Sequence, residues 1–137
     1  MPDAPRISRQ LESSLYVADP DASAAFYQRV FGFEALLRDD RMVGLAVSGG
    51  SVLLLFRRGG SVEPSPVLGG VIPPHDGNGT LHLCFAIPLA ELDAWDRHLA
   101  VLGIPVESRV VQSLGGTSLY FRDPDGHSLE VAVPGLW

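Results

Sequence analysis

The chain of 137 residues is 46% hydrophobic and 19% charged, which is the composition of a compact globular domain and excludes a disordered chain. Its formal net charge of −6 at pH 7 argues against nucleic acid or an anionic membrane as a partner. All ten basic residues are arginines, so chemistry that needs a lysine, such as Schiff-base formation or a Walker phosphate loop, is excluded as well.

Residues 1–60 are predicted to form a first module of one strand, one helix and three further strands. Polar and apolar residues alternate over 11–17, as in a strand with one buried face. Asp19 then provides an N-cap with Pro20 as the first helical residue, and Gly32 ends the helix. Three strand-like runs follow, at residues 33–37, 42–47 and 51–56.

Residues 61–79 are rich in glycine, proline and serine and show no periodicity, which indicates a linker loop. The first pattern then returns in a second module over residues 80–137. A strand is predicted over 81–87 and a helix from Pro88 to the stop at Gly103. Strand-like runs follow at residues 106–112, 117–121 and 128–133.

A turn of sequence Asp-Pro-Asp-Gly, at residues 123–126, joins the last two predicted strands into a hairpin. Arg122 and His127 flank this turn, and we expect both at the protein surface. The order βαβββ, linker, βαβββ indicates an internal duplication with a period of about 70 residues. We therefore predict an α+β fold of two tandem βαβββ modules that make up one integrated domain.

One face of each predicted sheet must be apolar where it packs on its helix, which leaves the other face free to line a cavity. Three ionisable residues lie on that second face: Glu12, His82 and Glu130. Glu130 is the most demanding, because a carboxylate between apolar neighbours is expensive to bury without a partner. Two carboxylates and one imidazole on rigid strands form a site for a divalent metal ion with open positions. The alternatives are a hydrogen-bonded core histidine and a solvated edge glutamate.

The segments SLYVADPDASAAFYQRVFGFEALLR, HLCFAI and GGTSLYFRDPDGHSLEV together resemble the vicinal oxygen chelate superfamily. That superfamily includes glyoxalase I, fosfomycin-resistance thiol transferases, extradiol dioxygenases and bleomycin-resistance proteins. The resemblance implies a curved half-barrel of sheets around a cavity, and a homodimer. It also implies that His82, Glu130 and the residue five before Val17, which is Glu12, hold a divalent ion (Mn, Fe, Zn, Ni or Mg).

Three departures from the family patterns bear on the choice of activity. Glu12 stands where the family has His or Gln, and Val52–Phe56 lacks the fourth ligand of glyoxalase I. Val110 stands near the position of the basic residue that binds phosphonate in the fosfomycin-resistance enzymes. A three-ligand site is therefore the better match, and Glu12 could alternatively serve as a base.

Two further residues are candidates for proton transfer. Tyr120 is predicted to face the cavity, where its hydroxyl could donate a proton or orient a substrate, or could simply point into water. His75 precedes the strand of His82 and could reach the cavity mouth as a base, although a histidine on a loop is usually exposed.

We expect a cytoplasmic, metal-dependent enzyme of the lyase, isomerase or dioxygenase-like type acting on a small substrate with adjacent oxygens. Cys84 is the one cysteine of the sequence, which fits a reducing compartment, and residues 1–14 contain no apolar signal segment. The alternative is a metal-free protein that sequesters a drug, as bleomycin-resistance relatives do, with an acidic, aromatic-lined groove. A third reading is an inactive relative in which these residues form a structural ion pair.

Overall fold

A computed structural model describes residues 3–135 and Trp137 of the chain, and it has the predicted tandem order of elements. The first module consists of β1 (Glu12–Val17), α1 (Pro20–Phe31), β2 (Glu34–Arg38), β3 (Met42–Val47) and β4 (Ser51–Arg57). A short hairpin follows, made of β5 (Ser65–Val67) and β6 (Gly70–Ile72). The second module consists of β7 (His82–Ala86), the 3₁₀ turn Leu89–Glu91, α2 (Leu92–Val101), β8 (Ser108–Val111), β9 (Thr117–Arg122) and β10 (Ser128–Ala132).

The two modules have the same sheet topology, which confirms the predicted α+β fold of two βαβββ units. The strand order is β1-β4-β3-β2 in the first sheet and β7-β10-β9-β8 in the second. In each sheet the first strand pairs in parallel with the last strand of its module, and the other pairs are antiparallel. The parallel pairing requires a crossover, and the single helix of each module provides it.

The ends of α1 follow from its sequence. The Asp19 side chain accepts hydrogen bonds from the backbone N–H groups of Asp21 and Ala22, at 3.0 and 3.2 Å. Pro20 occupies the first turn, where a missing N–H costs nothing. Gly32 ends the helix in the left-handed conformation, with φ at 70°.

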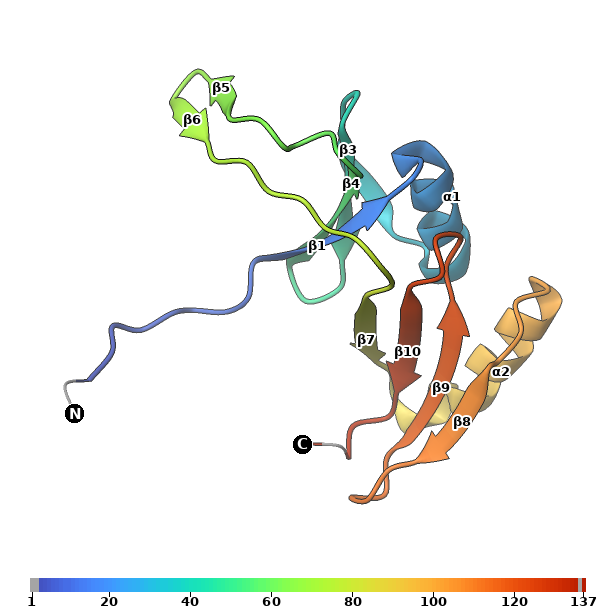
Figure 1. Cartoon of the computed structure of the whole chain (residues 1–137). Helices are drawn as coiled ribbons and strands as arrows, with labels where there is room; N and C mark the ends of the chain where they lie inside the picture. The colour runs from blue at the N-terminus through green and yellow to red at the C-terminus, as the bar shows by residue number, and fades with distance from the viewer. Residues whose placement is uncertain (1–2, 136) are drawn as a thin grey trace.

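The hydrophobic core lies between the two helices and the faces of the sheets that they cover (Figure 1). Alternate strand residues point into it and are fully buried, whereas their neighbours face the other way. These core residues include Leu15, Val17, Leu53, Leu55, Leu119, Phe121, Leu129 and Val131. The faces without a helix remain available for a site, as the sequence predicted.

The turn between β9 and β10 forms the joint between the modules. The Tyr27 hydroxyl of α1 donates to Asp123 Oδ2 at 2.8 Å, and Ala18 N donates to Asp125 Oδ1 at 2.8 Å. His127 Nδ1 accepts from Leu81 N at 2.8 Å, and His127 Nε2 therefore donates to the carbonyl of Tyr16 at 2.9 Å.

The expectation of a surface His127 was wrong, because its side chain is completely buried in this joint. A polar ring can be buried there because both ring nitrogens have backbone partners from different modules. Arg122, by contrast, is exposed as expected and pairs with Glu107.

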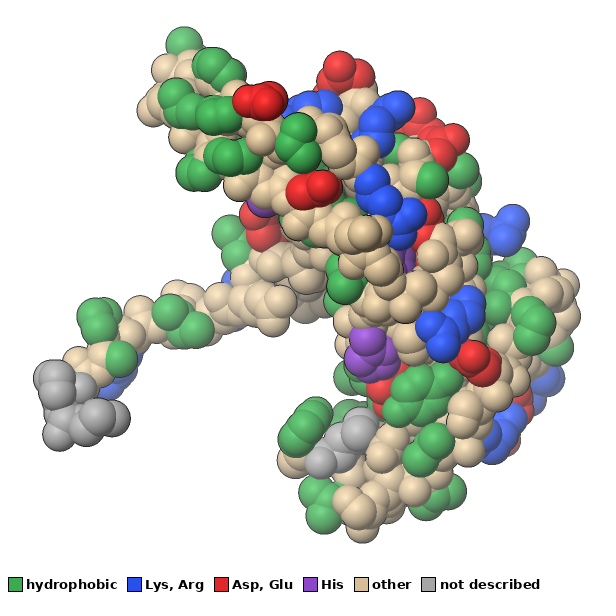
Figure 2. All heavy atoms as spheres, viewed as in Figure 1, with side chains coloured by type: hydrophobic (Ala, Val, Ile, Leu, Met, Phe, Trp, Pro, Cys, Tyr) green, Lys and Arg blue, Asp and Glu red, His purple; other side chains and the backbone are tan. Residues whose placement is uncertain are grey.

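The segment between the modules is more ordered than the predicted loop, because β5 and β6 pair as a hairpin within it. This hairpin projects from the first module and exposes Val67, Leu68, Val71 and Ile72. Figure 2 shows the molecule hollowed on the side between the hairpin and the second module. No helix of the described residues is long and apolar enough to span a membrane.

Candidate functional site

His82 and Glu130 meet on the face of the second sheet that no helix covers. They lie on the adjacent parallel strands β7 and β10, where Ser128 is opposite His82 and Glu130 is opposite Cys84. His82 Nε2 and Glu130 Oε1 are 3.3 Å apart. The His82 side chain is 51% exposed and that of Glu130 only 5%. Glu130 is therefore buried, whereas His82 can be reached from solvent.

Hydrogen bonds hold both members of the pair. The ring nitrogen His82 Nδ1 lies 2.9 Å from the carbonyl of Ser128, and it must carry the hydrogen because a carbonyl only accepts. The other ring nitrogen, Nε2, therefore faces Glu130. Ser118 Oγ donates to Glu130 Oε2, which leaves Oε1 as the carboxylate oxygen that faces the imidazole.

Tyr120 lies beside the pair, on β9. Its ring stacks on that of His82, with centroids 6.2 Å apart and planes inclined by 22°. Tyr120 is also directly opposite Glu130 in the antiparallel register of β9 and β10. Among the sequence candidates, the second module thus brings together His82, Glu130 and Tyr120.

Cys84 borders the same carboxylate but stays a thiol. Burial, the negative charge of Glu130 and a hydrogen bond with Glu130 raise the pKa of Cys84 from 9.0 to about 12. A thiol is a poor nucleophile and a poor metal ligand compared with a thiolate. Cys84 therefore stays protonated at neutral pH.

The remaining candidates, Glu12 and His75, lie on the uncovered face of the first sheet. With Tyr16 they border a cavity of about 450 Å³. The Tyr16 hydroxyl and His75 Nδ1 share a hydrogen bond of 2.8 Å, and the His75 ring packs edge-on against Phe56. Burial and the nearby Asp76 raise the pKa of Tyr16, so its phenol stays protonated at neutral pH and can donate to His75.

The structure therefore divides the predicted site residues between two modules. Glu12 borders the cavity of the first module, whereas His82 and Glu130 pair on the second. Among residues 3–135 and Trp137, no three His, Cys, Asp or Glu side chains lie close enough together to hold a metal ion. One chain by itself supplies two of the three predicted ligands in contact.

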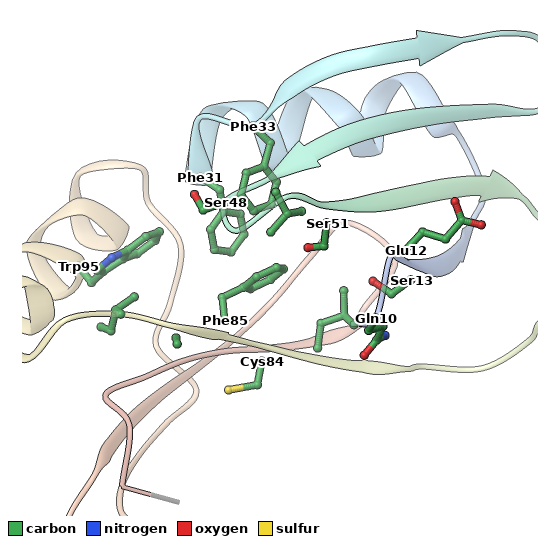
Figure 3. A pocket seen from close by; sticks show the side chains of 14 residues that line it. Gln10, Glu12, Ser13, Phe31, Phe33, Ser48, Ser51, Cys84, Phe85 and Trp95 are labelled. Carbon is green, nitrogen blue, oxygen red and sulfur yellow. The ribbon is translucent and has the colours of Figure 1, made fainter. Parts of the chain in front are cut away.

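A second cavity, of about 490 Å³, lies between the modules (Figure 3). Aromatic side chains form one part of it, with Phe31, Phe33, Phe85 and Trp95 close together. Glu12 borders its polar end. The cavity combines an aromatic wall with a carboxylate.

Sequence reasoning missed one polar residue of the second module, Gln112. Its amide lies within hydrogen-bond distance of both Ser118 and Tyr120. The available signal was its position as a polar residue at the end of a predicted strand, shortly before the glycine pair Gly115–Gly116.

Comparisons with known proteins agree on one family. The model of the Glyoxalase/Bleomycin resistance protein/Dioxygenase superfamily matches residues 9–131. The crystal structure of lactoylglutathione lyase from Agrobacterium tumefaciens aligns with a TM-score of 0.86 and 38% identity, over 96% of this chain and 97% of that one.

Two curated relatives are more distant in sequence. Metallothiol transferase FosB of Shouchella clausii is 30% identical over 118 residues, which is 84% of this chain and 73% of the relative. Catechol-2,3-dioxygenase of Bacillus subtilis is 28% identical over 123 residues, which is 87% of this chain but 39% of the dioxygenase. By their names, these relatives and the lyase are enzymes of different classes.

Proposed function

The chain belongs to the Glyoxalase/Bleomycin resistance protein/Dioxygenase superfamily, and from that membership we propose that it is a divalent-metal-dependent enzyme. Its substrate is a small molecule with two adjacent oxygen atoms. The reaction is of the lyase, isomerase or dioxygenase-like type. The relatives named as metallothiol transferase, dioxygenase and lyase support an enzyme of this family.

The observation that carries the proposal is the approach of His82 Nε2 to Glu130 Oε1, to 3.3 Å. Because the Nδ1 hydrogen is committed to the Ser128 carbonyl, Nε2 is the nitrogen that faces the carboxylate, and a cation or a proton between Nε2 and Oε1 accounts for their contact. Two ligand atoms bound to one ion at about 2.1 Å lie roughly 3.0–3.4 Å apart. The pair therefore fits a divalent metal, and the Ser128 carbonyl provides the outer hydrogen bond that metal-bound histidines usually have.

We assign the third ligand to Glu12 of a second copy of the chain. Within one chain Glu12 lies apart from the pair, but the uncovered faces of both sheets are open to another molecule. A homodimer that sets the first module of one copy against the second module of the other brings Glu12 to the His82–Glu130 pair. The set of two carboxylates and one imidazole suits Mn, Fe, Zn, Ni or Mg better than Cu.

The same pairing gives each remaining candidate a role. When bound, a divalent ion supplies Lewis acidity to the two substrate oxygens. Tyr120, stacked on His82, donates a hydrogen bond or a proton to the substrate from its hydroxyl. His75, held by Tyr16, moves a proton at the wall of the cavity of about 450 Å³ that Glu12 also borders.

The test is the metal content of untagged protein, measured by elemental analysis for the parent and for His82→Ala and Glu130→Gln. We expect stoichiometric metal in the parent and its loss from both variants, because each substitution removes one ligand of the His82–Glu130 pair. Glu91→Gln, at an exposed position of the 3₁₀ turn, is the matched control and should keep its metal.

Equal metal content in all four proteins would contradict the proposal. It would favour the metal-free alternative, a protein that sequesters an aromatic cation. The cavity bordered by Phe31, Phe33, Phe85, Trp95 and Glu12 is the observation that supports this second candidate.

A further inference from the structure

Gln112 links two side chains of the uncovered face to each other. It follows the last residue of β8, and its Nε2 lies 3.1 Å from Ser118 Oγ and 3.3 Å from Tyr120 Oη. Ser118 and Tyr120 are two residues apart on β9, so they share the face that also carries Glu130. Gln112 thus contacts both Ser118, which donates to the Glu130 carboxylate, and Tyr120, which lies opposite Glu130.

The chemistry of Glu130 fixes the direction of these hydrogen bonds. A carboxylate only accepts, so the single hydroxyl hydrogen of Ser118 is committed to Glu130 Oε2. Ser118 Oγ can then only accept from Gln112, which requires the amide nitrogen, and not the amide oxygen, to face it. The orientation of the Gln112 amide therefore follows from the hydrogen-bond network.

The same argument determines where the Tyr120 proton points. The amide nitrogen that donates to Ser118 has a second hydrogen, and Tyr120 Oη is its acceptor. Because one lone pair of that oxygen is occupied by Gln112, the phenol hydrogen is free to point elsewhere. Tyr120 lies opposite Glu130 on the uncovered face, so its free hydrogen is available to a molecule bound on that face.

The backbone holds Gln112 in place. Gln112 N donates to the carbonyl of Gly116 at 2.6 Å, and Gly115 N donates to the carbonyl of Gln112 at 2.9 Å. Gly116 cannot be replaced easily, since a Cβ there would lie 2.4 Å from the carbonyl oxygen of Val133. The turn is thus braced against the strand end that follows Glu130.

We propose that Gln112 is a positioning residue that orients two hydroxyl groups. By donating to both oxygens, it directs the Ser118 hydroxyl hydrogen to Glu130 and leaves the Tyr120 hydroxyl hydrogen free to donate to substrate. This inference rests on the proposed function, because it assigns the roles around the carboxylate that would hold the ion. Ser118 is the intermediate, completely buried and in contact with both Gln112 and Glu130.

The first experiment measures Mn(II) affinity by isothermal titration calorimetry for the parent, Gln112→Met, Ser118→Ala and the double variant. We expect Ser118→Ala to weaken binding by about ten- to a hundredfold, the usual effect of losing an outer partner of a ligand, and Gln112→Met by roughly three- to tenfold. The double variant should bind no more weakly than Ser118→Ala, because Gln112 acts on Glu130 through Ser118.

Gln28→Met, on the exposed face of α1, is the control for replacing a glutamine by a methionine and should bind as the parent does. Parent-like affinity of Gln112→Met, or losses that multiply in the double variant, would overturn the inference. The proposed function fails separately, if the parent binds no Mn(II) or if His82→Ala binds it equally well.

The second experiment reads the hydrogen bonds without any metal. In ¹⁵N-labelled protein treated with a chelator, the side-chain amide signals of Gln112 should shift in both Ser118→Ala and Tyr120→Phe, and should not shift in Gln28→Met. Amide signals that respond to neither of the first two variants would refute the inference even for a protein that binds metal.

Discussion

At the scale of single residues, Glu130 is the residue that other polar side chains on the uncovered face of the second module contact. It is only 3% exposed, between the completely buried Leu129 and Val131. The sequence predicted that such a carboxylate needs partners, and the structure provides them in the Ser118 hydroxyl and the His82 ring. The charge of Glu130 also raises the pKa of the neighbouring Cys84 thiol.

The pKa of the Cys84 thiol is a measure of the Glu130 charge. Alkylation of Cys84 can be followed without ambiguity because the sequence has one cysteine. In metal-free protein we expect the rate of reaction with iodoacetamide to rise only well above pH 9, since burial and Glu130 raise the pKa of Cys84 to about 12. Glu130→Gln removes the second of these causes and should move the midpoint of the pH profile down. A profile centred near 9 in the folded parent would contradict this prediction.

The same shift affects stability with a definite sign. The folded thiol keeps its proton where the unfolded thiol, with a pKa of 9.0, loses it. The contribution of Cys84 to the free energy of unfolding is therefore complete below pH 9 and is lost progressively as the pH rises toward about 12. Cys84→Ser should remove this part of the alkaline loss of stability in chemical unfolding experiments.

At the scale of elements, the turn between β9 and β10 serves the fold more than the chemistry. Asp123 Oδ1 accepts from the N–H groups of Asp125 and His127, at 3.0 and 2.8 Å, which shapes the turn. Its Oδ2 accepts from the buried Tyr27 hydroxyl of α1. A short motif of the second module thereby fixes the position of the first.

Replacing Asp123 by alanine should therefore destabilise the protein strongly. We expect a loss of about 3 kcal/mol in the free energy of unfolding, because the buried Tyr27 hydroxyl and two turn N–H groups lose their acceptor. Urea unfolding followed by circular dichroism measures it.

Asp39→Ala is the matched control, since Asp39 Oδ1 also accepts from two backbone N–H groups of a turn, those of Arg41 and Met42, but at an exposed position. Its loss should be only about 1 kcal/mol. Equal losses for the two variants would mean that the contact with Tyr27 contributes little to the joint.

At the scale of the whole molecule, the chain presents surfaces that fit a second copy. The N-terminal segment exposes Ile7 and Leu11, and the β5–β6 hairpin exposes Leu68 and Val71, all beside the hollow face of Figure 2. Burial of such residues against another molecule is favourable. The proposed homodimer would cover them and unite the two sets of site residues.

Complementation between inactive variants tests this arrangement. Glu12→Gln and His82→Ala are co-expressed with different tags, and the heterodimer is isolated through both. If Glu12 comes from the partner, the heterodimer contains one site with all three native ligands and one site with two replaced. It should then bind one Mn(II) ion with the parent's affinity, although neither homodimer does.

If Glu12 instead acts with the pair of its own chain, both sites of the heterodimer lack one ligand, and no parent-like site appears. The double variant of Glu12→Gln and His82→Ala in one chain, paired with a native chain, is the internal control. It should show no parent-like site in the partner arrangement, because each site lacks one ligand.

A chain that remains monomeric by light scattering at all concentrations would contradict the dimer directly.

The sequence by itself determined the elements of the two modules and their tandem order, though not the β5–β6 hairpin between them, because alternation, caps and turn residues act within a few neighbours. The helix stop at Gly32 and the position of Glu130 on the face of its strand opposite Leu129 and Val131 follow from such local rules. The tertiary structure decided what depends on packing one module against the other. It buried His127 in the joint, separated Glu12 from His82, and brought Gln112 behind Ser118, since each of these placements depends on the folding together of segments that no local pattern connects.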